Sequence, residues 1–153
     1  MTKEVISVDI DSFNSVEDCE TAHELELLNP DMLTSTGIVL LVLGAHSEQV
    51  VKHSKTNVKK YIGASEMAKK QKREAEFTDK LVDTRDQTEI DSSANRVVGW
   101  LNVTQEFSQA LLKAALKRNP LWIGQINDFS EAVGNFTKRP ALASPSTPDS
   151  WHG

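Results

Sequence analysis

The side chains that most often carry out chemistry are present in this 153-residue chain, but their spacing does not form a site. None of its four histidines, His23, His46, His53 and His152, pairs with another at the spacing of helical metal ligands. His46 and His53 are seven residues apart, nominally on one helix face, yet no cysteine or further histidine joins them. Protein zinc sites need three or four ligands, so we predict no metal site.

The single cysteine and one pair of carboxylates are the remaining candidates for catalysis. Cys19 lies in an acidic segment, and negative neighbours raise the pKa of a thiol, so we do not expect a nucleophile there. Asp9 and Asp11 alternate with apolar residues, which predicts that both lie on the solvent face of a strand. Catalytic carboxylate pairs need a cleft that gives the two groups different environments.

Phosphate-binding and acyl-transfer motifs are also missing from the sequence. The seven glycines do not have the spacing of a phosphate-binding loop, and no serine lies in a nucleophile elbow. We therefore expect a protein that is not an enzyme and uses no cofactor.

Composition indicates one globular domain, with 39% hydrophobic and 25% charged residues. The net charge of −5 is unevenly distributed. Residues 1–31 hold nine acids and one base, whereas residues 52–85 hold ten of the seventeen Lys and Arg residues. We expect the acidic segment to lie near a basic helix face.

The chain shows no signal for export or for membrane insertion. Its N-terminus lacks a basic region followed by an apolar block, and its longest apolar run, Ile38 to Leu43, is far shorter than a membrane span. We expect a cytoplasmic protein with no membrane partner.

Hydrophobic periodicity predicts strands first and helices later. Residues 4–13 alternate as a half-buried strand does, residues 17–28 could form a short helix, and residues 37–44 form a buried strand that could pair with the first. Ser47 is the predicted N-cap of a long helical stretch, which loosens at Gly63 and ends near Gly99.

Two short helices are predicted in the last third of the chain. The first begins at the N-cap Ser108 and ends at Asn119-Pro120. The second begins with Asn119 as its cap and Pro120 in its first helical position, and Gly134 ends it as a left-handed C-cap. Phe136 can then fold back on its last turn.

The predicted fold class is α+β and predominantly helical. It combines a small N-terminal β element, a long central helix and a C-terminal helical pair. Along the chain this gives an acidic arm with strands (1–46), a charged helical region (47–99), a compact aromatic-rich unit (100–136) and a flexible tail (137–153). The central helix has a narrow apolar stripe, so we expect that the chain can form homo-oligomers.

Large apolar residues gather in the aromatic-rich unit and are the candidate protein-binding residues. Five of the nine aromatic residues lie there, and two short helices cannot bury five rings without help. Trp and Phe are favoured as anchors in protein interfaces. The candidates are Trp100, Phe107, Trp122, Ile126, Phe129 and Phe136.

Five segments resemble, in order and spacing, elements of a group of small proteins of tailed bacteriophages. The resemblance covers about residues 32–136, and the acidic arm and the tail lie outside it. The segments are GIVLLVLG with HS (37–44 and 46–47), RVVGWLNV (96–103), EFS (106–108), NPLWIGQI (119–126) and NF (135–136).

That group is the family of tail assembly chaperones. The resemblance implies a helical protein in the host cytoplasm that binds the tape-measure protein or tail-tube subunits before the tube polymerises. It also implies that the protein is absent from the finished virion. Such a chaperone needs acidic residues for solubility and apolar residues on helices for its grip, and this chain has both.

Two other functions stay open from the sequence. The acidic arm and the proline-containing tail would also suit a virion structural protein, such as a capsid decoration or head-tail connecting protein. The lysine-rich stretch would suit a basic-helix nucleic-acid-binding protein. Its five acids, Glu66, Glu74, Glu76, Asp79 and Asp83, would repel phosphate, so nucleic acid is not the partner that we expect.

Overall fold

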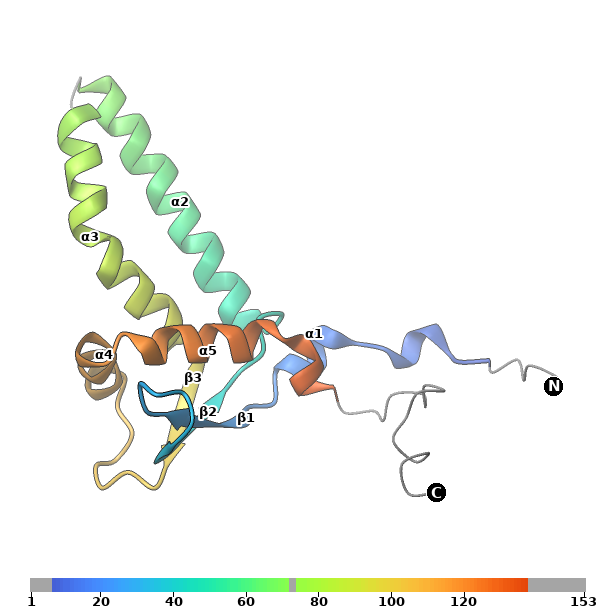
Figure 1. Cartoon of the computed structure of the whole chain (residues 1–153). Coiled ribbons are helices and arrows are strands. Elements are labelled where there is room, and N and C mark those ends of the chain that lie inside the picture. The colour runs from blue at the N-terminus through green and yellow to red at the C-terminus, as the bar shows by residue number, and fades with distance from the viewer. Residues whose placement is uncertain (1–6, 72–73, 138–153) are drawn as a thin grey trace, which may run out of the picture.

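The computed structural model describes residues 7–71 and 74–137. A small sheet packs under two short helices, and a two-helix hairpin and an N-terminal arm project from this body in different directions (Figure 1). The predicted class, α+β and predominantly helical, is confirmed.

The sheet has three antiparallel strands in the order β1-β2-β3. They are β1 (His23–Leu28), β2 (Ser35–Val42) and β3 (Val97–Leu101), and the register places Leu40 between Leu25 and Trp100. The predicted buried strand is confirmed as β2. Its predicted pairing with residues 4–13 is wrong, because β2 pairs with β1 and β3 instead.

The segment 17–28 does not form one helix. Helix α1 (Ser15–Cys19) ends early, and β1 follows. Glu24 and Glu26 are exposed in β1, whereas Leu27 is completely buried, so the strand alternates between an outer and an inner face.

The N-terminal strand is also wrong over its described part, and residues 4–6 lie outside the described residues. A 3-10 turn, η1 (Ile10–Ser12), forms in its place. Asp9 Oδ1 accepts from the Asp11 amide at 3.1 Å, and Ser12 Oγ donates to the Asp9 carbonyl at 2.6 Å. These local hydrogen bonds satisfy the backbone where no neighbouring strand is available.

The long central helix is a hairpin of two helices, α2 (Glu48–Lys70) and α3 (Glu74–Asn95). Ser47 caps α2 as predicted, since its Oγ accepts from the Val50 amide. Gly63 does not loosen α2, because one glycine costs only about 1 kcal/mol in a helix of good formers. The helical run stops at Asn95 and not near Gly99, where β3 lies instead.

The C-terminal helical pair is α4 (Gln109–Arg118) and α5 (Leu121–Glu131), followed by the 3-10 turn η2 (Val133–Phe136). Ser108 is the N-cap of α4 as predicted. Asn119 does not cap α5: its side chain donates backward to the Ala115 carbonyl and closes α4. Gly134 is not a left-handed cap either, because α5 has already ended and Gly134 lies within η2.

The core lies between the sheet and the helices α3, α4 and α5. Strand β3 starts inside the predicted central region and ends inside the predicted aromatic-rich unit, so the division at residue 99 passes through one strand of the sheet. The buried cluster consists of Leu27, Leu40, Val42, Ile90, Ala94, Val97, Leu112, Leu116 and Ile126.

Candidate protein-binding groove

An apolar groove opens between the sheet and α4, with a cavity volume of about 210 Å³. Leu40 of β2 and Leu112 of α4 belong to the buried cluster and form part of its walls. The other residues that line it are Leu27, Ile38, Trp100, Val103, Gln105, Leu111, Ala115, Arg118, Asn119 and Trp122.

Trp100 is held in a fixed orientation on the sheet side of the groove. Its Nε1 donates to the Gln105 carbonyl at 2.9 Å, which also folds the loop after β3 back toward the strand. Phe107 meets the indole edge to face, with ring centroids 5.1 Å apart. A hydrogen bond and an aromatic contact together limit the freedom of the ring, so little entropy remains to be lost on binding.

The helical side of the groove carries an apolar rim with one positive charge. Trp122 is half-buried at the start of α5, and Leu111 on α4 is 44% exposed. Arg118 lies two turns further along α4 and is exposed, so its guanidinium can bind a carboxylate at the edge of an apolar partner.

The structure separates the six predicted candidates. Trp100 and Trp122 line the same groove, and Phe107 supports Trp100 from behind. Ile126 is fully buried in the core and cannot touch a partner, which corrects its prediction as a binding residue.

Phe129 and Phe136 lie outside the groove. Phe136 is fully buried, with its ring centroid 5.5 Å from that of Phe129 and 5.0 Å from that of His23. The prediction that Phe136 folds back on the end of α5 is confirmed. As a binding residue it is corrected, since no part of its side chain reaches the surface.

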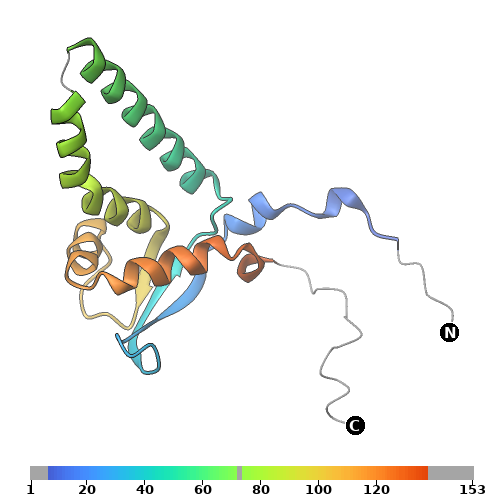
Figure 2. The ribbon, with the colours of Figure 1, turned by 45° about the horizontal axis from the view of Figure 1, so that its top comes forward.

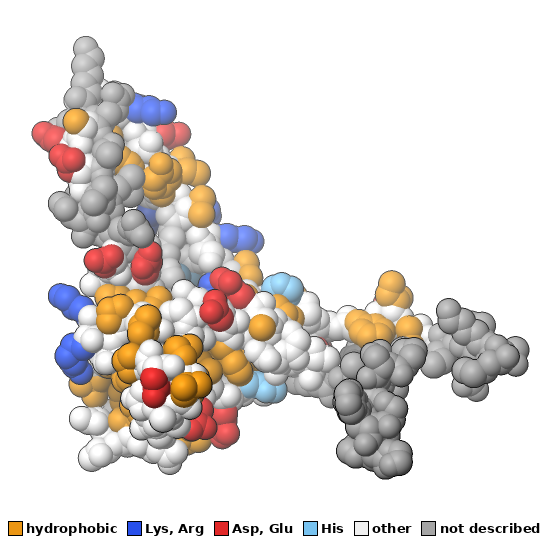
Figure 3. Space-filling model, in the orientation of Figure 1, with side chains coloured by type: hydrophobic (Ala, Val, Ile, Leu, Met, Phe, Trp, Pro, Cys, Tyr) orange, Lys and Arg blue, Asp and Glu red, His pale blue; other side chains and the backbone are white. Residues whose placement is uncertain are grey.

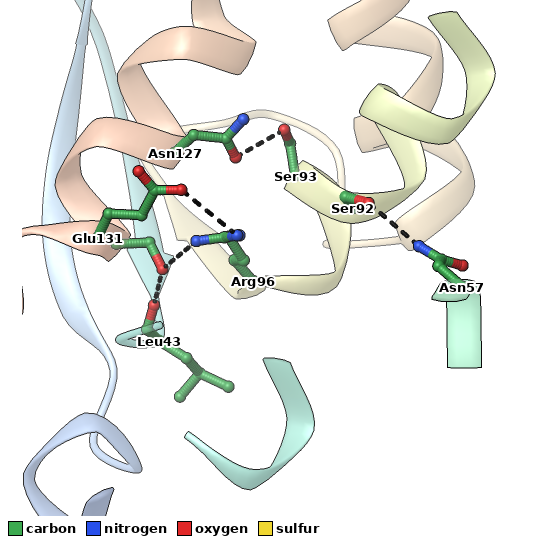
Figure 4. A network of polar contacts seen from close by, with 8 residues as sticks. Leu43, Asn57, Ser92, Ser93, Arg96, Asn127 and Glu131 are labelled. Atoms are coloured by element: carbon green, nitrogen blue, oxygen red, sulfur yellow. Dashed lines mark hydrogen bonds and ion pairs between the residues drawn. The ribbon is translucent and has the colours of Figure 1, made fainter. Parts of the chain in front are cut away.

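A polar network links α5 to the residues that follow β2 and α3 (Figure 4). Ser130 Oγ donates to the Leu43 carbonyl at 2.8 Å and accepts from Arg96 at 3.1 Å. Glu131 lies 3.9 Å from the same guanidinium. Burial lowers the pKa of Arg96, and the Glu131 carboxylate opposes that shift.

Ser93 and Asn57 extend these contacts to the hairpin (Figure 4). Ser93 Oγ donates to Asn127 of α5 at 2.9 Å, and Asn57 of α2 donates to Ser92 of α3 at 3.4 Å. The base of the hairpin is therefore attached to the helix that carries Trp122.

Sequence reasoning missed several residues that line the groove. Leu111, Ala115 and Arg118 recur at spacings of four and three and share one face of α4, which was a readable signal. Ile38 was placed in a strand, but its position beside Trp100 depends on the register of β2 with β3, which no local pattern specifies.

The residues first considered for chemistry do not assemble into a site. Cys19 is buried, and this burial is the main cause that raises its thiol pKa, with Asp18 and Glu20 adding to it. Among the residues whose side chains the structure describes, no three His, Cys, Asp or Glu side chains come together as metal ligands do. No helix in the described part of the chain has the length and apolar character needed to cross a membrane.

Comparisons of the chain with protein-family models, with curated proteins and with solved structures found no match.

Proposed function

We propose that this chain is a tail assembly chaperone of a tailed bacteriophage, which acts in the host cytoplasm without a cofactor. It binds an apolar segment of the tape-measure protein, or of the tail-tube subunits, before the tail tube polymerises. The observation that carries the proposal is the groove between the sheet and α4, which Trp100 and Trp122 both line together with the exposed Leu111.

The groove has the chemistry that such a client requires. A long apolar client aggregates unless its side chains are covered. Rigid tryptophans in a concave apolar site are the residues that contribute most to binding in many interfaces. Arg118 at the rim favours a client helix with an acid beside its apolar residues, and the net charge of −5 keeps the complex soluble.

The segments that resemble the chaperone family supply much of this site. RVVGWLNV contributes Trp100 and Val103, EFS contributes Phe107, and NPLWIGQI contributes Asn119 and Trp122. Segments distant in sequence thus meet around one groove, which supports a binding role for them.

Co-expression with the tape-measure protein of the same phage tests the proposal. The wild-type chain should keep that protein soluble and co-purify with it. Leu111→Lys places a charge on the apolar wall and should reduce recovery of the complex at least tenfold, about 1.4 kcal/mol. Leu101→Lys is the matched control, because Leu101 is about as exposed as Leu111. Leu101 follows Trp100 in β3, so its side chain lies on the face of the sheet opposite to the groove. Equal recovery with both variants would contradict the proposed site.

Mass spectrometry of purified particles separates the chaperone from a virion structural protein. A chaperone should be abundant in the infected-cell lysate and absent from the particles. Many copies per particle would instead make the chain a capsid decoration or connecting protein.

A binding measurement at increasing salt tests the third function, a nucleic-acid-binding protein. Partner binding that falls steeply with salt would favour it.

A further inference from the structure

The N-terminal arm, residues 7–14, exposes apolar side chains between acids. Val8 is 57% and Ile10 82% exposed, and Asp9 and Asp11 alternate with them. Residues 7–20 contain five acids and no Lys or Arg. Neither Asp9 nor Asp11 forms an ion pair with any residue of the described ranges. The arm is therefore an acidic and apolar segment, and its carboxylates have no cationic partner among the described residues.

The base of the arm is attached firmly to the body. The Cys19 carbonyl accepts from the Gly44 amide at 3.1 Å, and Ser15 Oγ lies 3.0 Å from His46 Nδ1. Glu20 Oε1 accepts from the Glu48 amide at 2.6 Å, which places a carboxylate at the N-terminus of α2. From this base the arm runs away from both the body and the hairpin (Figures 1 and 2).

Helix α2 carries a complementary surface along its outer side. Val51, Val58 and Ile62 recur at spacings of seven and four, which places them on one face, and they are 38%, 57% and 50% exposed. Lys55 and Lys59 lie on or beside the same face, and neither forms an ion pair with a described residue. We refer to these five residues as the lysine-flanked stripe.

The stripe differs from the side of α2 that contacts α3. Val50 and Ala68 are buried, and Asn57 donates to Ser92 across the hairpin, so the inner face already has a neighbour. Hydrophobic side chains are visible both on the arm and along α2, where lysines separate them (Figure 3). As a whole, α2 holds six lysines against two glutamates.

We propose that the arm of one copy binds the lysine-flanked stripe of a second copy. Val8 and Ile10 pack against Val58 and Ile62, which lie one helical turn apart, and the arm carboxylates lie against Lys55 and Lys59. Because each chain carries both halves and its own arm leads away from its stripe, two copies can exchange arms about a two-fold axis. This inference does not depend on the groove, which stays open in such a dimer.

Light scattering on the intact protein gives the first test. At about 100 µM the wild type should have twice the mass of the 17.0 kDa chain. Val8→Asp with Ile10→Asp should yield single chains, and because both residues are exposed the fold should persist by circular dichroism. Leu33→Asp is the matched control, since Leu33 is 85% exposed in the β1–β2 turn, and it should remain a dimer. A wild type of single-chain mass would overturn the proposal, as would a dimer unchanged by the arm variant.

A charge exchange distinguishes binding between chains from binding within one chain. Asp9→Lys with Asp11→Lys gives a basic arm, and Lys55→Glu with Lys59→Glu gives an acidic stripe. Each variant alone should weaken the dimer about tenfold or more, because like charges then meet. An equimolar mixture should restore the dimer, since each arm then finds a complementary stripe on the other variant. Failure of the mixture to associate would overturn the proposal.

Lys55 and Lys59 could also attract a polyanion such as DNA. Adding DNA to the protein distinguishes a nucleic-acid site from an arm-binding site. A DNA duplex added to the wild type should leave its dimer mass unchanged below a few hundred millimolar salt. If the duplex instead dissociates the dimer and binds single chains, and Lys55→Glu with Lys59→Glu abolishes this, the stripe is a nucleic-acid site and the proposal fails.

Discussion

Gly44 and Cys19 touch where the chain leaves β2 and approaches α2. A Cβ atom at position 44 would lie 2.6 Å from the Cys19 Cβ and closer still to its sulfur. Cys19 is completely buried, so its side chain has little room to move aside. The close approach requires glycine here for space and not for a special backbone angle, because Gly44 has no positive φ.

Gly44→Ala and Gly63→Ala should therefore change stability in opposite directions. Overpacking at position 44 should lower the free energy of unfolding by about 1–3 kcal/mol. Nothing lies near a Cβ at position 63, and alanine is the better helix former, so that variant should gain about 0.5–1 kcal/mol. Urea unfolding of both variants measures the effect. Equal shifts would show that the Gly44 contact is relieved by movement.

The Cys19 thiol should be unreactive in the folded protein. Its pKa lies above the ordinary value of 9.0, mainly because it is buried, so less thiolate is present at pH 8 than in the unfolded chain. Because the folded state holds the thiol proton more tightly than the unfolded state, the free energy of unfolding should decrease as the pH rises. The decrease begins at about pH 9, the pKa of the unfolded thiol, and ends above the higher pKa of the folded thiol. Labelling with a disulfide reagent at pH 8 should be slow before denaturation and fast after it. Rapid labelling of the folded protein would contradict this.

Gln125 links helix α5 to the edge of the sheet. Its side-chain amide accepts from the Leu28 amide at 2.8 Å and donates to the Leu28 carbonyl at 3.1 Å. One side chain thus takes the place that a neighbouring strand would occupy at the end of β1. This covers backbone groups that an edge strand would otherwise offer to another chain.

Gln125→Leu should remove this link and leave two backbone groups of Leu28 without partners. We expect a loss of about 1–3 kcal/mol in the free energy of unfolding. Gln87→Leu is the matched control, because Gln87 is exposed on α3 and, among the described residues, donates to Asp91 one turn away. Its loss should be about 0.2–0.5 kcal/mol. Thermal unfolding followed by circular dichroism compares the two, and similar melting temperatures would show that water replaces the amide.

Phe136 joins the two ends of the described chain. Its ring is fully buried between His23 at the start of β1 and Phe129 near the end of α5. The turn η2 that carries it also packs against α1, the base of the arm. A residue late in the sequence therefore holds the earliest helix in place.

Phe136→Ala should cost about 3–5 kcal/mol, as truncation of buried aromatic residues does. Because η2 supports α1, the same variant should also make the Cys19 thiol more reactive under native conditions. Denaturant unfolding and thiol labelling provide the two readouts, with Leu33→Ala as the surface control. A stability loss without faster labelling would mean that α1 is held independently of Phe136.

Several features of this fold were readable from local chemistry. The caps at Ser47 and Ser108 and the buried strand β2 follow from short-range rules and are confirmed. Errors arose where two local patterns compete. Residues 17–28 could be taken for a helix, although Leu25 and Leu27 alternate with Glu24 and Glu26, because the strand becomes favourable only when β2 lies beside it.

The sequence by itself determined the predominantly helical class, the N-caps at Ser47 and Ser108, and the charge asymmetry between the first 31 residues and α2, since these depend on residues close together in the chain. The tertiary structure decided that Val97–Leu101 is a strand, that Ile126 and Phe136 are core, and that Trp100 and Trp122 share one groove. Each of these depends on contacts between segments distant in sequence. Such contacts depend on strand register and on packing, which the local periodicity of the sequence does not specify.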